Sequence, residues 1–341
     1  MSAPRALVLT AGLGSRLRPL TYVRAKAAVP VNGETLARRV VRWLVSQGVT
    51  DLVLNLHHRP ESITGSVGDG ADLGARVRYS WEQPLLGSGG GPRHALPLLV
   101  DGFGPAKPGP QIQSPESRVS NPGSQVYFIV NGDTLTNVNL TALHQRHARS
   151  GARVTMALIA NPRPEKYGGV VVNASAVVTG FTRPGAVREN YHFVGVQCVD
   201  ASVFAALPDG VPAESVNGVY KDLLASAPGS VAAFVSNARF QDIGTPADYL
   251  RTSIQLAAVE GDHMASSQNV QVAPSAVVRG TAVWDDVVIG ADSTLVDCIV
   301  ADGARIPPHV RYERCAIVPA GGRAAGAGEQ IAGELLIVPF D

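Results

Sequence analysis

Short apolar runs that alternate with helical patterns fill residues 6–256, and this alternation constrains the fold more than any other feature of the sequence. Strands are predicted at Ala6–Leu9, Leu52–Leu54, Val77–Tyr79 and Val126–Val130. Between the first two, residues 35–47 place apolar side chains at helical spacing and predict a helix. The pattern favours an α/β, Rossmann-like domain with a mostly parallel sheet and helices on both faces. In such sheets, ligands bind at the carboxyl ends of the strands.

A different pattern begins after about residue 261. Aliphatic residues recur there every five or six positions, at Val272, Val278, Val283, Ile289, Leu295, Val300 and Ile306. This period matches one side of a triangular β-helix and resembles the hexapeptide repeat of left-handed β-helices. About two coils are expected. Cys298 and Cys315 would then stack one coil above the other as small buried fillers.

Composition excludes several classes of protein. The chain has 29 basic and 28 acidic residues, a formal net charge of +1, which provides no strong field to recruit nucleic acid. Neither an apolar run long enough to cross a membrane nor a signal peptide is recognised, so no membrane partner is expected. Three cysteines without a CxxC pair suit a reducing compartment. We expect a soluble cytoplasmic protein.

These patterns predict two domains. Residues 1–262 would form the α/β domain, and residues 263–341 would form a short β-helix. Within the first domain, residues 101–124 are rich in Pro, Gly and Ser and predict a flexible surface insertion. The β-helix carries no catalytic constellation. We expect it to serve assembly into a homo-oligomer, with a second copy of the chain covering its apolar ends.

A glycine-containing segment, TAGLGSR, follows the first predicted strand directly at residues 10–16. Gly12 and Gly14 would let backbone N–H groups close around phosphate oxygens. The segment completes neither the dinucleotide-binding GxGxxG motif nor the Walker motif. Three cations lie within a dozen residues of it: Arg16, Arg18 and Lys26. This charge favours a triphosphate over a dinucleotide.

With its continuation, the segment resembles the N-terminal signature of the sugar-1-phosphate nucleotidylyltransferases, G-x-G-[ST]-R-L-x-P-L-T followed by a lysine-proline pair. Residues 12–21 match the signature in full and Lys26 matches the lysine, whereas Ala27 stands where proline is usual. Further motifs follow in the family's order to about residue 260, namely LGSGGGPRHA, VNGD, YGGV, FVG and FQDIGTP. The chain is therefore identified as similar to this family.

The resemblance implies an enzyme that transfers a nucleotidyl group from a nucleoside triphosphate to a sugar 1-phosphate and releases pyrophosphate. Such a reaction needs charge neutralisation and in-line positioning rather than a protein nucleophile. By resemblance, Arg16 holds the β- and γ-phosphates and Lys26 neutralises the α-phosphate. Asp133 and Asp242 are implied as ligands of a Mg²⁺ ion, with Asp133 also counted as catalytic.

The resemblance also implies contacts with the two substrates. The nucleotide-binding residues would be Ala11, Gly12, Gly14, Ser15, Arg16, Gln83, Gly87 and Ser88. The last two belong to a glycine-rich turn at residues 86–91, which is expected to recognise the base. The sugar-phosphate-binding residues would be Tyr167, Gly168, Arg183 and Gly195. Arg183 stands where the family usually has the lysine of F-x-E-K-P, and the acidic partner is missing.

The identity of the substrates is less constrained. GTP and mannose 1-phosphate are the first choice, because family members with a β-helix of this small size often have that specificity. A uridylyltransferase acting on N-acetylmuramic acid 1-phosphate with UTP is the alternative, and the glycine-rich turn does not decide between them. A non-catalytic regulatory homologue is a third hypothesis. It is disfavoured because Arg16, Lys26, Asp133 and Asp242 are all present.

Overall fold

The computed structural model describes residues 4–101, 125–186, 190–260 and 268–341. The chain divides into two compact units, which are described in turn. The first unit holds the described residues within 1–12, 40–58 and 67–240, and the second holds those within 13–39, 59–66 and 241–341. All but residue 101 of the predicted insertion lies outside the described residues, as does the predicted domain boundary near residue 262. Both stay predictions.

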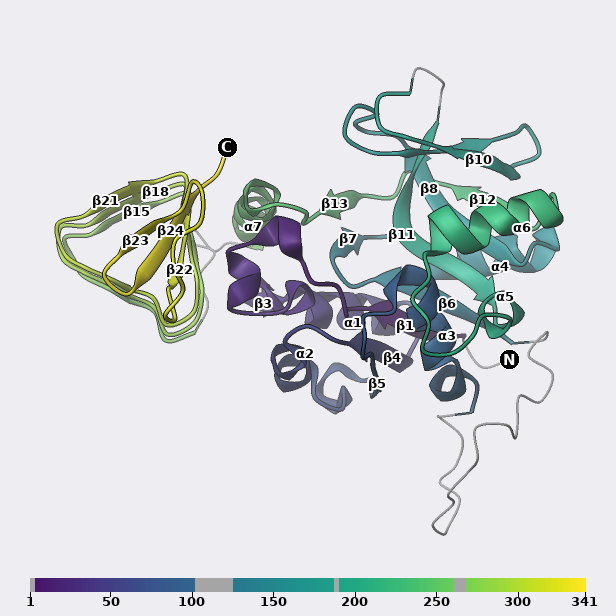
Figure 1. The fold of residues 1–341 in the computed structure, drawn as a ribbon, viewed down its shortest axis with the longest axis horizontal. Coiled ribbons are helices and arrows are strands. Elements are labelled where there is room, and N and C mark those ends of the chain that lie inside the picture. The colour runs from purple at the N-terminus through teal and green to yellow at the C-terminus, as the bar shows by residue number, and fades with distance from the viewer. Residues whose placement is uncertain (1–3, 102–124, 187–189, 261–267) are drawn as a thin grey trace, which may run out of the picture. The chain divides into compact units, whose positions relative to one another are not determined.

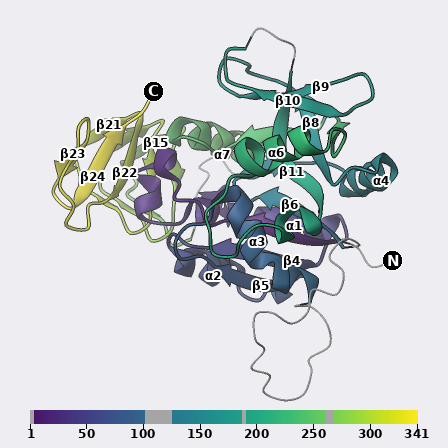
Figure 2. The same ribbon diagram turned by 45° about the vertical axis from the view of Figure 1, so that its right-hand side comes forward.

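Nine strands of the described first unit form one sheet (Figures 1 and 2). They are β1 (Arg5–Leu9), β4 (Asp51–Leu56), β5 (Arg76–Trp81), β6 (Val126–Asn131), β8 (Val154–Ala160), β9 (Gly169–Val172), β10 (Val178–Thr182), β11 (Tyr191–Asp200) and β12 (Val231–Val235). The four strands predicted from the sequence are parallel neighbours, as expected, and the structure gives their order as β6, β1, β4 and β5. Strand β11 runs antiparallel to both β6 and β8, so the sheet as a whole is mixed.

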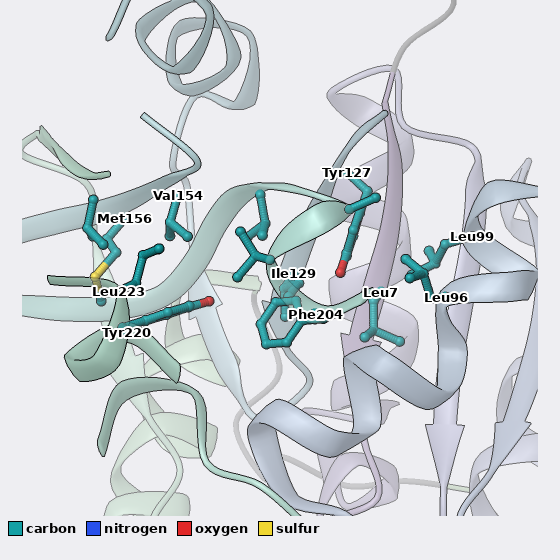
Figure 3. Packing of buried hydrophobic residues seen from close by; sticks show 14 of the residues in the cluster. Leu7, Leu96, Leu99, Tyr127, Ile129, Val154, Met156, Phe204, Tyr220 and Leu223 are labelled. Carbon is teal, nitrogen blue, oxygen red and sulfur yellow. The ribbon is translucent and has the colours of Figure 1, made fainter. Parts of the chain in front are cut away.

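Helix α3 (Gly87–Val100) packs against the parallel strands. Its Leu96 and Leu99 share one buried cluster with Leu7 of β1 and Ile129 of β6 (Figure 3). Fully burying each such side chain contributes about 1.5–3 kcal/mol, so this contact fixes the helix on the sheet. Further helices are α1 (Leu36–Ser46, which begins in the second unit), α4 (Leu140–Ser150), α5 (Ser202–Ala205), the π-helical turn η6 (Ser215–Tyr220) and α6 (Lys221–Ser226).

The glycine-rich segment 86–91 differs from its prediction, because Gly87 begins helix α3 rather than a turn. The backbone of the neighbouring segment 211–214 lies directly against these glycines. The Gly89 N–H donates to the carbonyl of Ala213 at 2.8 Å, and a Cβ on Gly90 would lie 2.5 Å from the carbonyl oxygen of Val211. Glycine has a poor helix propensity, and this packing against the backbone offsets it. The packing partners are distant in sequence, so the composition of the segment does not predict the helix.

The second unit begins with a segment of short helical turns. Its elements before the repeats are η1 (Ser15–Leu17), η2 (Leu20–Tyr22), η3 (Lys26–Ala28), β2 (Pro30–Val31), β3 (Glu34–Thr35), α2 (Pro60–Val67) and α7 (Pro246–Glu260). Strands β2 and β3 form an antiparallel hairpin. The side chain of Thr35 in that hairpin hydrogen-bonds Ser66 at 2.6 Å, which joins the hairpin to the end of α2.

Residues 271–319 form a β-helix of three coils stacked in register, visible as the green-to-yellow part of Figure 1. The first coil holds β14 (Gln271–Val272), β15 (Val277–Arg279) and β16 (Ala282–Val283), the second β17 (Val288–Ile289), β18 (Thr294–Val296) and β19 (Ile299–Val300), and the third β20 (Arg305–Ile306), β21 (Arg311–Glu313) and β22 (Cys315–Pro319). Five of the predicted aliphatic positions belong to its buried core cluster, and the other two, Val272 and Val278, are partly buried and pack against that cluster. The expected number of two coils was wrong, because the third coil carries Tyr312 where the coil before it has Leu295.

The stacking of the two cysteines is confirmed. Cys298 and Cys315 are buried free thiols separated by seventeen residues in the chain, and their sulfur atoms lie 3.7 Å from each other.

Beyond the third coil, β24 (Leu335–Pro339) pairs antiparallel with β22, and β23 (Gln330–Ala332) pairs with β24. The chain itself therefore continues the sheet at this end of the coil stack. Assembly through the β-helix stays a prediction.

The glycine packing of α3 can be tested by Gly90→Ala. The added Cβ would meet the carbonyl oxygen of Val211, so we expect the free energy of unfolding to fall by about 1–3 kcal/mol. Gly65→Ala in α2 is the matched control, because nothing lies within 4 Å of its added Cβ. That variant should gain about 0.5–1 kcal/mol instead. Urea unfolding followed by circular dichroism measures both, and equal stability of the two variants would contradict the packing.

Candidate functional site

A cavity of about 230 Å³ lies at the carboxyl ends of parallel strands in the first unit. Its lining residues are Leu9, Ala11, Gly12, Asn55, Glu82, Leu85, Gly87, Ser88, Asn131 and Asp133. Five of them were predicted site residues: Ala11, Gly12, Gly87, Ser88 and Asp133. They come from three separate segments, which follow β1, β5 and β6. Gln83 is absent from this lining, whereas its neighbour Glu82 is present.

A buried hydrogen-bond network connects two of these segments through Asn55 and Glu82, each 3% exposed. The Asn55 Oδ1 atom accepts from the backbone N–H of Thr10 at 2.6 Å and of Ala11 at 3.3 Å. The Asn55 Nδ2 atom donates to Glu82 Oε1 at 2.7 Å. The Glu82 Oε2 atom accepts from the backbone N–H of Leu86 at 2.9 Å. The network therefore holds the glycine-containing segment and the start of α3 at fixed positions around the cavity.

This network was not predicted from the sequence. A signal was available, because Asn55 interrupts the apolar run LVLNL of β4 and Glu82 directly follows β5. A polar residue within a buried strand must find a hydrogen-bond partner, and the oxygens of amide and carboxylate side chains can accept from backbone N–H groups. The partners themselves are distant in sequence, so the chain alone does not identify them.

In the second unit, residues 13–28 fold into a tight segment that carries the predicted phosphate-binding residues. Gly14 has a φ of 61° there, and an added Cβ would lie 2.7 Å from Thr21 Cγ2 and 3.0 Å from Lys26 Cβ. The Thr21 hydroxyl donates to the Gly14 carbonyl at 3.1 Å. Ser15 and Arg16 begin η1 and are exposed. The segment thus brings Gly14 against Lys26 and leaves Arg16 accessible.

Asp242 also belongs to the second unit, at the end of strand β13 (Phe240–Asp242). It is not the cap of the following helix. Helix α7 is capped instead by Thr245, whose hydroxyl oxygen accepts from the Asp248 N–H at 3.2 Å. The structure places Asp133 in the first unit and Asp242 in the second.

A second cavity of about 680 Å³ in the first unit contains two of the predicted sugar-phosphate residues, Gly168 and Arg183. Lys221, Asn217 and His192 also line it. Tyr167 lies beside it, with its ring centroid 4.5 Å from that of His192. The cavity therefore combines two cations with aromatic and amide side chains, which suits a phosphorylated polyol.

Gly195 lies elsewhere, in an irregular part of β11 where the pairing with β8 shifts between Phe193 and Gln197. Its φ of 76° is in the left-handed region, and an added Cβ would lie 2.6 Å from the Nδ2 atom of Asn131. Because Asn131 lines the smaller cavity, Gly195 supports the wall of that cavity. It is not among the residues that line the larger one.

His192 is a residue of the larger cavity that the sequence analysis did not single out. Burial lowers its pKa to about 4, so the ring is neutral at neutral pH. Its Nδ1 atom is buried and has no hydrogen-bond partner among the described residues. The ring packs against those of Tyr167 and Phe240, at centroid distances of 4.5 and 4.4 Å, and these two rings also contact each other.

None of the helices in the described part of the chain combines the length and the apolar character needed to cross a bilayer. No group of three or more His, Cys, Asp or Glu side chains there is arranged to hold a metal ion.

A glycine-containing segment after the first strand, and a cavity with a carboxylate at the strand ends, define a nucleotide-binding α/β protein. Residues 5–258 match the nucleotidyl transferase family, and the chain belongs to that family. It is 26% identical over 323 residues to the mannose-1-phosphate guanylyltransferase of Mycobacterium tuberculosis (strain ATCC 25618 / H37Rv), covering 91% of this chain and 83% of the relative.

Two further proteins extend the comparison. The chain is 28% identical over 253 residues to the D-glycero-alpha-D-manno-heptose 1-phosphate guanylyltransferase of Aneurinibacillus thermoaerophilus, covering 74% of this chain and 97% of the relative. The structure of HddC from Yersinia pseudotuberculosis complexed with GMP-PN matches with a TM-score of 0.58 at 20% identity, covering 74% of this chain and all of the other. The last match supports the fold. The predicted family, the α/β fold class and the prediction of an enzyme are confirmed.

The hydrogen-bond network of the smaller cavity can be tested by Glu82→Gln. The new amide would have to turn its NH₂ group toward either Asn55 Nδ2 or Leu86 N, and both of these are donors. We expect the free energy of unfolding to fall by about 1–3 kcal/mol, because a buried donor loses its acceptor. Glu61→Gln is the control, since that side chain is 68% exposed, and it should change stability by less than about 0.5 kcal/mol. Identical urea midpoints for the two variants would contradict the role of Glu82.

Proposed function

We propose that the protein transfers a guanylyl group from GTP to mannose 1-phosphate, giving a nucleotide sugar and pyrophosphate. The reaction class, nucleotidyl transfer to a sugar 1-phosphate, is the one predicted from the sequence, and the family match and the relatives bear it out. The choice of GTP and mannose 1-phosphate is supported by the guanylyltransferase relative that covers 91% of the chain.

The observation that carries the proposal is the gathering of five predicted residues around one cavity. Ala11 and Gly12 follow β1, Gly87 and Ser88 begin α3, and Asp133 follows β6. Small residues from the first two segments leave room for a ligand to approach the backbone. The carboxylate comes from the third. We assign the nucleotide to this cavity.

In the proposed reaction, an oxygen of the sugar phosphate attacks the α-phosphorus of the triphosphate. The new O–P bond forms as the bond between the α-phosphorus and the bridging oxygen breaks, and pyrophosphate leaves with that oxygen. Arg16 would hold the β- and γ-phosphates, and Lys26 would neutralise charge on the α-phosphate in the transition state. Gly14, Ser15 and the N–H groups of their segment would fix the triphosphate for in-line attack.

The residues present fit a divalent metal ion, for which we propose Mg²⁺. Asp133 supplies a hard carboxylate oxygen at the cavity wall, and Asp242 would supply the second. Mg²⁺ commonly uses one or two carboxylates plus substrate phosphates and waters rather than a cage of protein ligands. This agrees with the lack of a three-ligand cluster among the described residues. When bound, the ion would stabilise negative charge on the phosphates.

The larger cavity is the proposed site of the sugar 1-phosphate. Arg183 and Lys221 line it and would bind the phosphate, and Asn217 would contact hydroxyl groups. Tyr167 and Gly168 are assigned to the same site. His192 adds a neutral aromatic ring to the wall of the same cavity, where it would pack against the sugar.

A pyrophosphate-release assay of four nucleoside triphosphates against a panel of sugar 1-phosphates tests the proposal. We expect kcat/KM to be greatest for GTP with mannose 1-phosphate. Greater turnover of UTP with N-acetylmuramic acid 1-phosphate would instead support the alternative acceptor and base. Release of pyrophosphate from none of the combinations, with nucleotide binding retained, would favour a non-catalytic homologue.

Removal of the Asp133 carboxylate should abolish turnover without unfolding the chain. We expect Asp133→Asn to retain less than about a tenth of the activity in Mg²⁺, because loss of a metal ligand costs several kcal/mol of transition-state stabilisation. Asp209→Asn is the control, since Asp209 pairs with His94 on the surface and should keep full activity. An Asp133→Asn enzyme that works as well as this control would refute the metal-ligand assignment.

A further inference from the structure

Arg24 joins the segment that carries Arg16 and Lys26 to the β-helix. Its Nε and Nη2 atoms donate to the two carboxylate oxygens of Asp302, at 2.6 and 2.8 Å, and Nη2 also donates to Asp285 at 2.5 Å. All of these residues belong to the second unit. The arginine lies two residues before Lys26, and its partners lie in successive coils of the β-helix.

The surroundings of this ion pair are partly desolvated. The side chains of Arg24, Asp285 and Asp302 are 18%, 28% and 23% exposed. Burial raises the pKa of Asp302 above its ordinary value even beside the arginine. The guanidinium also lies over the ring of the fully buried Trp284, 5.7 Å from its centroid. A forked, half-buried pair of this kind fixes geometry, because the planar guanidinium meets the carboxylate at two points.

Two more contacts hold the same segment. The indole N–H of Trp284 donates to the hydroxyl of Tyr249 at 2.7 Å, and that hydroxyl donates to the carbonyl of Pro30. Two guanidinium groups lie over the ring of Tyr22, that of Arg18 at 5.5 Å and that of Arg323 at 4.7 Å from the ring centroid. The segment from Arg18 to Pro30 is thus attached to α7, to the first two coils and to the loop after β22.

We propose that Arg24, Asp285 and Asp302 are positioning residues for nucleotidyl transfer, through which the β-helix holds the segment of Arg16 and Lys26 in its triphosphate-binding conformation. This inference rests on the proposed function, because it takes the roles of Arg16 and Lys26 from there. It revises the expectation that the β-helix serves assembly alone. The β-helix contributes no reacting group. It contributes rigidity to the segment that binds the phosphates, and loss of that rigidity costs binding energy because the ligand must then order the segment.

The test uses the full chain with Arg24→Ala, Asp302→Asn and the double variant. Asp302→Asn is nearly isosteric, so it keeps the test valid if Arg24→Ala impairs folding. Arg251→Ala is the control, because Arg251 makes an ion pair with Asp248 within α7. Hydrogen exchange of residues 15–28, the dissociation constant of GTP and steady-state kinetics are measured for each variant.

We expect exchange over residues 15–28 to accelerate in the single variants and to stay unchanged in the control. The dissociation constant and KM for GTP should rise by about tenfold, which equals about 1.4 kcal/mol, while the KM for the sugar 1-phosphate stays constant. The double variant should be no worse than the worse single variant, because both remove the same contact. Arg24→Lys should recover only part of the GTP affinity, since lysine keeps the charge but not the fork.

Failure of this inference and failure of the proposed function would give different results. Unchanged exchange over residues 15–28 together with unchanged GTP affinity in Asp302→Asn would overturn the inference. A fall in kcat that is proportional to the fraction of folded enzyme, with every KM unchanged, would also overturn it. Such a result would mean that the ion pair only stabilises the fold. A wild-type chain that binds GTP but transfers it to no sugar 1-phosphate would refute the proposed function, while weaker GTP binding by the variants would still support the positioning role.

Discussion

The buried contact between the Asn55 amide and the Glu82 carboxylate is the constraint on which the smaller cavity depends. Through it, the backbone N–H groups of Thr10 and Ala11 are tied to that of Leu86. These three N–H groups, at the ends of a strand and a helix, are thereby fixed in orientation. A cavity bounded by glycine and other small residues has little side-chain packing of its own to define it, so polar groups behind its wall must do so.

In the second unit, a segment is held in place by an ion pair rather than by a buried amide–carboxylate contact. The segment that we propose to bind the phosphates consists of short 3-10 turns, which have few hydrogen bonds of their own. Arg24 connects this segment to a carboxylate 278 residues away in the chain. A β-helix is a rigid support for such a contact, because its backbone groups pair between successive coils. In this unit, the residues proposed to bind the phosphates therefore lie far along the chain from the carboxylates that hold Arg24.

Much of the fold follows from local patterns in the sequence. The four predicted strands, the helix at residues 35–47 and the inward aliphatic positions of the repeats are all present, because each depends on periodicity within a short window. The helix at Gly87 could not be predicted in this way, since it depends on contact with residues 211–214. The third coil was missed because Tyr312 fills an aliphatic position. Motifs likewise predicted five residues of the smaller cavity, whereas Asn55, Glu82 and His192 act through partners that only the folded chain brings near.

The seventeen-residue spacing of the coils restricts how this part of the chain can vary in length during evolution. Gain or loss of one whole coil keeps every inward side chain inward, whereas a change by a single residue would turn the following strand over. Insertions and deletions that preserve the core therefore add or remove whole coils of seventeen residues. Asp285 and Asp302 occupy equivalent places in successive coils. A chain shortened by one step would still present a carboxylate to Arg24, so the two ends of the protein would stay joined while the number of coils changed.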